Sequence, residues 1–85
     1  SLTDIIGIDT LDISSVTDFT DFLLGVTLPT SRYDSLLVNY EAQAPNSGLN
    51  FHGGNSTYTI GSAADTARNN LINTYNWSIT DGGGT

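Results

Sequence analysis

The sequence predicts an α+β fold in which a coil-rich solenoid end over residues 1–26 is followed by a small helix-and-strand cap over residues 27–81 and a glycine-rich tail over 82–85. Three observations predict it. Residues 1–5 and 15–19 carry nearly the same phrase, which is the self-similarity of repeat proteins. Two later segments have the apolar periodicity of helices, and short alternating segments between turn residues have that of strands.

The first 26 residues combine short apolar alternation with frequent interruption. Ile6 and Ile8 alternate as in a strand, as do Leu11 and Ile13, but Asp, Ser and Thr break the pattern every few residues. Such polar side chains bond the turning backbone at bends, while the apolar ones point inward. The segment therefore predicts tight coils and argues against a long helix.

A first helix is expected after Pro29. Thr30 or Ser31 is placed to cap its start, with Asp34 as the acid of a capping box three residues after Ser31. Turn residues follow Gln43, so the helix should end near that residue. One buried stripe is predicted from the i, i+3, i+4, i+7 spacing of Tyr33, Leu36, Leu37 and Tyr40.

The second half is expected to contain three strands and one helix. Residues 49–52 alternate as a half-buried strand, 53–55 form a turn, and Tyr58 and Ile60 alternate again. Residues 77–80 form the last strand, with Trp77 and Ile79 on one side.

The second helix is expected to start at a capping box made by Ser62 and Asp65. Its buried face should carry Ala64, Ala67, Leu71 and Tyr75. The predicted order of the second half is therefore strand, strand, helix, strand.

Composition limits the classes of function. Nine acidic residues stand against two arginines and no lysine, for a net charge of −7, which excludes nucleic acid and argues against anionic membrane surfaces. No apolar run is long enough to span a bilayer. The abundance of Ser, Thr, Asn and Gly is typical of secreted or virion-surface proteins, so we expect an extracellular location.

The chain is small and has few means of cross-linking itself. It has 85 residues, no cysteine and a single histidine, so disulfides are excluded and a structural zinc site is not expected. We expect stability to come partly from packing on neighbouring repeats or on other copies of the chain. The sequence begins in the middle of a pattern, which indicates a piece of a longer polypeptide.

Pairs of carboxylates are the first candidates for chemistry. Asp9 and Asp12, Asp18 and Asp21, and Asp34 lie near predicted bends. Nothing in their spacing fixes two acids across a cleft, as a glycosidase requires, so we interpret them as solvated turn residues. Weak calcium binding by turn Asp side chains is the alternative, although no known calcium-loop spacing is present. No cofactor is predicted.

His52 is the one residue suited to act as a base near neutral pH. No Gly-x-Ser-x-Gly segment supplies a nucleophile for it, so a strand-edge histidine is the favoured interpretation. Gly53-Gly54-Asn55 is not followed by the Gly-Lys-Ser/Thr of a phosphate loop, so it is interpreted as a turn. We therefore expect no catalytic residues and no enzymatic activity.

Five aromatic residues and two N-glycosylation patterns are further candidate sites. Exposed together, the aromatic residues would form a sugar-stacking platform, but their spacing places most of them in the core. The patterns beginning at Asn55 and Asn76 match N-glycosylation sites and are interpreted as chance matches. The aromatic residues in question are Tyr33, Tyr40, Tyr58, Tyr75 and Trp77.

Residues 11–19 read Leu-Asp-Ile-Ser-Ser-Val-Thr-Asp-Phe. This phrase resembles the repeat of BspA-type leucine-rich-repeat surface proteins, in which Leu-Asp-Val-Ser-Asn-Val-Thr-Asp-Met is typical; Phe19 stands where that family more often has Met. The later residues resemble the segment that closes such repeats in proteins of marine bacteria and in tail or fibre proteins of environmental phages. The matching pieces lie at 26–30, 33–37, 54–58, 67–72 and 75–83.

The resemblance implies a leucine-rich-repeat-like solenoid end with a terminal cap. It implies a non-catalytic module, displayed on a cell or virion surface and used for adhesion or assembly, with neighbouring repeats or copies of the chain as partners. A carbohydrate- or receptor-binding adhesin tip, which would bind a host-surface protein or glycan, remains the alternative. The resemblance implies no catalytic, cofactor-binding or metal-binding residues.

Overall fold

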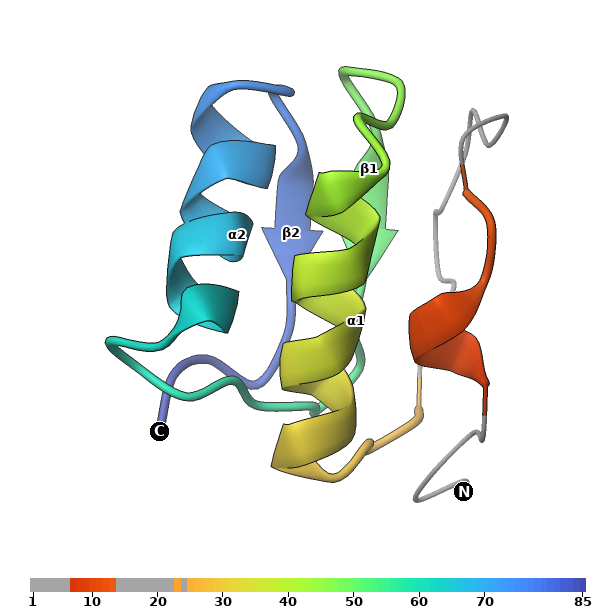
Figure 1. Cartoon of the computed structure of the whole chain (residues 1–85). Coiled ribbons are helices and arrows are strands. Elements are labelled where there is room, and N and C mark those ends of the chain that lie inside the picture. Colours follow the sequence, from red (N-terminus) through yellow and green to blue (C-terminus); the bar gives the residue numbers. More distant parts are fainter. Residues whose placement is uncertain (1–6, 14–22, 24) are drawn as a thin grey trace.

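The computed structural model describes residues 7–13, 23 and 25–85. Its elements, in chain order, are the short 3₁₀ helix η1 (Ile8–Thr10), the helix α1 (Thr30–Ala42), the strand β1 (Asn50–His52), the helix α2 (Ala63–Asn73) and the strand β2 (Ser78–Thr80) (Figure 1). The predicted α+β fold is confirmed.

The two strands form a parallel pair. Asn50 lies opposite Ser78, Phe51 opposite Ile79, and His52 opposite Thr80. Parallel neighbours require a crossover connection, and α2 provides it between β1 and β2. In Figure 1 the helices α1 and α2 lie side by side and run in the same direction, opposite to the strands behind them. The described chain thus consists of two consecutive helix–strand units, α1–β1 and α2–β2.

The core lies between the helices and the strands. Phe51 stacks on Trp77 with ring centroids 5.8 Å apart and meets the edge of Tyr40 at 6.2 Å. The stripe predicted on the first helix is fully buried, as are most of the apolar residues predicted on the second. The residues of these two helical stripes that the structure buries are Tyr33, Leu36, Leu37, Tyr40, Ala64, Ala67 and Leu71.

Two of the helix ends expected from the sequence are confirmed. Gln43 is the C-cap of α1, and Ser62 is the N-cap of α2, where its hydroxyl accepts from the Ala64 N–H. The expected capping box of α1 is wrong. Pro29 is the N-cap, and Asp34 instead accepts the Thr59 N–H and hydroxyl at 2.8 and 2.7 Å. The carboxylate of Asp34 therefore bonds a residue that is distant in the sequence instead of capping the helix.

Two further expectations need correction. Tyr58 makes a single parallel bridge to Gly84 rather than a strand of its own, and the side chain of Ile60 is 62% exposed. The glycine-rich tail over 82–85, for which the sequence predicted no contact, bonds the chain near Tyr58 through its backbone. Both differences arise because pairing between distant segments leaves no periodic signal in the sequence.

Backbone bonds link successive units in the same manner. The Leu23 N–H donates to the His52 oxygen at 2.9 Å, and the Gly53 N–H donates to the Thr80 oxygen at 2.6 Å. A second backbone bond lies beside each of these. The Asn55 N–H donates to the Val26 oxygen beside the first, and the Gly82 N–H donates to the Ser56 oxygen beside the second. The chain before α1 therefore meets α1–β1 much as that unit meets α2–β2.

The expected solenoid end over residues 1–26 falls only partly within the described chain. Residues 7–13 form η1 and an extended segment that packs against α1. The repeated phrases at 1–5 and 15–19 lie outside the described residues, as do Asp18 and Asp21.

Candidate functional site

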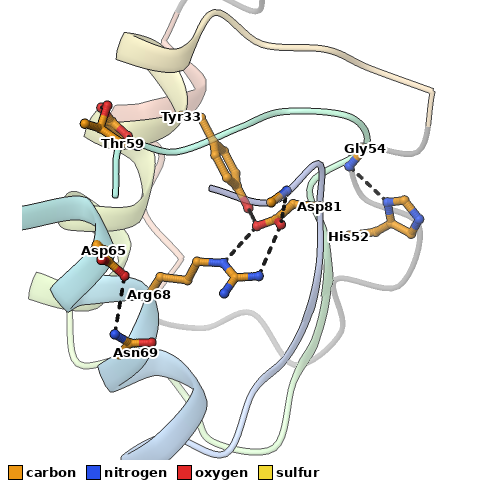
Figure 2. A network of polar contacts seen from close by, with 10 residues as sticks. Tyr33, His52, Gly54, Thr59, Asp65, Arg68, Asn69 and Asp81 are labelled. Atoms are coloured by element: carbon orange, nitrogen blue, oxygen red, sulfur yellow. Dashed lines mark hydrogen bonds and ion pairs between the residues drawn. The ribbon is translucent and has the colours of Figure 1, made fainter. Parts of the chain in front are cut away.

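The carboxylate of Asp81 is the centre of a buried polar network (Figure 2). Its side chain is 1% exposed. Arg68 of α2 donates from Nε to Oδ2 at 3.0 Å and from Nη2 to Oδ1 at 3.1 Å. The Tyr33 hydroxyl donates to Oδ2 at 2.6 Å, and the Gly83 N–H donates to Oδ1 at 2.9 Å. Each oxygen therefore has two donors, and the network joins α1, α2 and the chain after β2.

The network favours fixed protonation states. Burial, and then the hydrogen bond to Asp81, raise the pKa of Tyr33 far above its ordinary value. Burial lowers the pKa of Arg68, but the hydrogen bond and charge of Asp81 outweigh it, so this pKa also lies above its ordinary value. A neutral phenol and a charged guanidinium hold the carboxylate on both sides. This arrangement fixes three chain segments together and is poorly suited to moving a proton.

The buried phenols make folding sensitive to alkali. Burial also raises the pKa of Tyr40, so both Tyr33 and Tyr40 ionise near 10 when unfolded but well above 10 when folded. The contribution of the two phenols to the free energy of unfolding is complete below pH 10. It is lost as the pH rises above 10, by about 1.4 kcal/mol per pH unit for each phenol. Urea unfolding at several alkaline pH values measures this slope. The Tyr33→Phe variant should show about half of it; an unchanged slope would contradict the assignment.

Side chains nearer the end of α1 hold the backbone of the segment before the helix. Asn39 donates to the Asp9 oxygen at 2.9 Å, and the Tyr40 hydroxyl donates to the Ile8 oxygen at 2.7 Å. Gln43 accepts the Ile13 N–H at 2.7 Å and donates to the Leu11 oxygen at 2.8 Å. The contacts are to main-chain atoms, so they fix the position of the segment with little dependence on its side chains.

Replacing Gln43 by Leu tests this contact. The change removes both amide bonds and leaves the N–H of the buried Ile13 without its partner, so we expect a loss of about 1–3 kcal/mol in the free energy of unfolding. Chemical denaturation measures it, with Glu41→Leu on the same helical turn as the control. Equal effects of the two substitutions would show that the amide clamp contributes nothing specific.

His52 is used locally. Its Nδ1 accepts the Gly54 N–H at 3.0 Å, so the ring closes the turn that follows β1 (Figure 2). No acid is bonded to this ring in the described contacts. The predicted turn at Gly53 and Gly54 is present, and both glycines are buried against neighbouring backbone or side chains.

The candidate carboxylates are dispersed. Asp9 pairs with Arg32 at 3.3 Å, and Asp34 bonds Thr59, while Asp12 is exposed in the segment after η1. Within the described residues, no group of three or more His, Asp or Glu side chains is placed to hold a metal ion. The structure does not bring these acids together into one site.

The structure buries most of the candidate aromatic platform. Tyr33 and Tyr40 are 0% exposed and Trp77 is 3% exposed, while Tyr58 and Tyr75 are half-buried. The prediction that most of these rings belong to the core is confirmed. Of the glycosylation patterns, the one at Asn55 has its Ser56 buried, with the hydroxyl accepting the Leu28 N–H at 2.9 Å.

Sequence reasoning missed the three residues that organise the structure most. The last strand predicted from the sequence stops at residue 80, before Asp81, and Arg68 stands out only as one of two basic residues. Gln43 was treated as a helix end. An available signal was the scarcity of cations: with two arginines in the chain, each is a strong candidate for a specific carboxylate partner.

No protein-family model, curated protein or solved structure matches this chain. None of the helices in the described part of the chain has the length and apolar character needed to cross a membrane.

Proposed function

We propose that this chain is a non-catalytic structural and interaction module that closes one end of a leucine-rich-repeat-like solenoid in an extracellular surface, adhesin or virion appendage protein. Its partners are neighbouring repeats or copies of the chain, and its work is packing and presentation of surface.

The repeated lateral backbone bond is the observation that carries the proposal. Donation from Leu23 to His52 and from Gly53 to Thr80 gives two successive junctions the same connection. Stacked repeats are expected to contact their neighbours in this way, because each unit completes its core on the next one.

The outer side of α2 supports a closing role. Four of the five exposed positions on this helix are polar, the exception being Ala63 at its start, whereas its buried positions pack toward α1. A polar outer surface on the last unit is what solubility requires at the end of a repeat array. The exposed polar residues on α2 are Thr66, Asn69, Asn70 and Asn73.

The chemistry of the described side chains also favours a structural role. The histidine, both arginines and the buried carboxylate bond to the chain itself. The lysine-free, acidic, Ser/Thr/Asn-rich composition supports a location outside the cell or on a virion. The burial of Tyr33, Tyr40 and Trp77 removes three of the five rings that the adhesin-tip alternative would use.

An experimental structure of the natural polypeptide that carries these residues tests the proposal. We expect further coils packed on the side of residues 7–13 that faces away from α1, and solvent or an unrelated partner on the outer side of α2. Further repeats continuing from α2 would contradict the closing role. Turnover of any substrate that is lost in a folded His52→Ala variant would contradict the non-catalytic one.

A further inference from the structure

Residues 82–85 lie along residues 56–60 and make one parallel bridge to them, between Tyr58 and Gly84. The Gly82 N–H donates to the Ser56 oxygen at 2.8 Å, and the Tyr58 N–H donates to the Gly83 oxygen at 3.2 Å. The Thr85 N–H donates to the Tyr58 oxygen at 2.8 Å, and the Ile60 N–H donates to the Thr85 oxygen at 3.2 Å. We call residues 82–85 the glycine strip. Main-chain atoms alone make these four bonds.

Each glycine of the strip is required for a separate reason. A Cβ on Gly82 would lie 2.5 Å from the Asn55 oxygen, a backbone atom that has no room to move. Gly83 has a φ of +91°, which side chains rarely adopt. A Cβ on Gly84 would lie 2.4 Å from Cγ1 of Ile60 and 3.1 Å from the Tyr58 ring. Residues 55–60 therefore favour glycine in the strip for two reasons: there is little room for a side chain, and one position has a positive φ.

The surface under the strip is built by other parts of the chain. The Asn55 N–H donates to the Val26 oxygen, and Asp34 of α1 holds both the N–H and the hydroxyl of Thr59. The Tyr58 ring lies over the guanidinium of Arg68, 4.7 Å from it, and Arg68 is itself fixed by Asp81. Residues 55–60 are thus held mainly by other parts of the chain, and the strip adds the bond from the Gly83 N–H to Asp81.

We propose that residues 55–60 form a peptide-binding site for an extended, glycine-rich segment, which the chain fills with its own glycine strip. Binding is by strand addition, in which main-chain hydrogen bonds supply affinity and steric limits supply specificity. The ligand class is a peptide of the form Gly-Gly-Gly-Thr. The site shares the bond from Gly82 to Ser56 with the junction between α1–β1 and α2–β2, whereas the amides of Tyr58 and Ile60, which the test follows, lie outside that junction.

The test opens the site in the full chain and offers the peptide from solution. In Gly82→Ala the strip should leave its place, so the Tyr58 and Ile60 amides should exchange with solvent at least about 10-fold faster by NMR, while the Ser78 amide between the strands stays protected. Thr85→Ala, which keeps every backbone bond, is the matched control. Gly84→Val is a second opening variant, farther from Asp81.

Acetyl-Gly-Gly-Gly-Thr added at millimolar concentration should restore slow exchange at Tyr58 and Ile60 in either opened variant. Acetyl-Ala-Gly-Gly-Thr should not, and the wild-type chain should respond less because its site is already filled. The proposal is overturned if the opened variants stay folded but neither peptide changes these amides, or if both peptides act equally. Self-association of the opened variants that blocks the peptide would overturn it in favour of a contact between copies.

Discussion

Replacing Arg68 by Met is expected to lower the free energy of unfolding by about 3–5 kcal/mol, because it leaves a buried carboxylate without its counter-ion. Asp81 is 1% exposed and receives two of its four hydrogen bonds from this guanidinium. The tyrosine hydroxyl and the glycine amide that remain are neutral donors. A chain of 85 residues has a total stability of about 4–13 kcal/mol, so the variant should lose a large part of its stability.

Urea denaturation followed by circular dichroism measures this effect. Arg32→Met is the matched control, since Arg32 pairs with Asp9 at 3.3 Å in a more exposed setting and its loss should cost less. A double variant, Arg68→Met with Asp81→Leu, should recover part of the lost stability because it removes the unpaired charge. If Arg68→Met costs no more than Arg32→Met, the network is not the junction described above.

Gly54→Ala should be the second severe substitution. The added Cβ would fall 2.0 Å from the Val26 oxygen and 2.4 Å from the Leu23 oxygen, so the backbones of two units would have to separate. Gly54 also has a φ of +65°, which costs an alanine about 1–2 kcal/mol on its own. With the steric strain of overpacking added, we expect a total loss of about 2–5 kcal/mol.

Gly61→Ala separates the two contributions. Gly61 has a similar φ of +81°, but a Cβ there would meet nothing within 4 Å. Only the cost of backbone shape should appear, about 1–2 kcal/mol by the same denaturation measurement. Equal losses at Gly54 and Gly61 would mean that the close approach between units is not needed for stability.

Local patterns predicted the helices well. The stripe from Tyr33 to Tyr40, the end of α1 at Gln43 and the cap of α2 at Ser62 all depend on residues that are close in the sequence. Such neighbours meet in any helix, whatever the rest of the chain does. The two principal strands were placed to within about a residue for a similar reason, since alternation of burial is also a local property.

Contacts between distant segments were not predictable in the same way. Asp34 has the right spacing for a helix cap but bonds Thr59, which is 25 positions away. The tail after Asp81 looks like a linker in sequence because glycine supports both a flexible chain and a tightly packed strand. What distinguishes the two is the space around each glycine. That space is limited by Asn55 and Ile60, which come close to the tail only in the folded chain.

Hydrogen exchange at the amides that join successive units tests the central claim most directly. The donors are Leu23 and Asn55 at the first junction, and Gly53 and Gly82 at the second. If the units stack as described, all four amides should exchange at least about 100-fold more slowly than in an unfolded chain. Free exchange at Leu23 and Asn55 beside protected Gly53 and Gly82 would show that the first junction does not form.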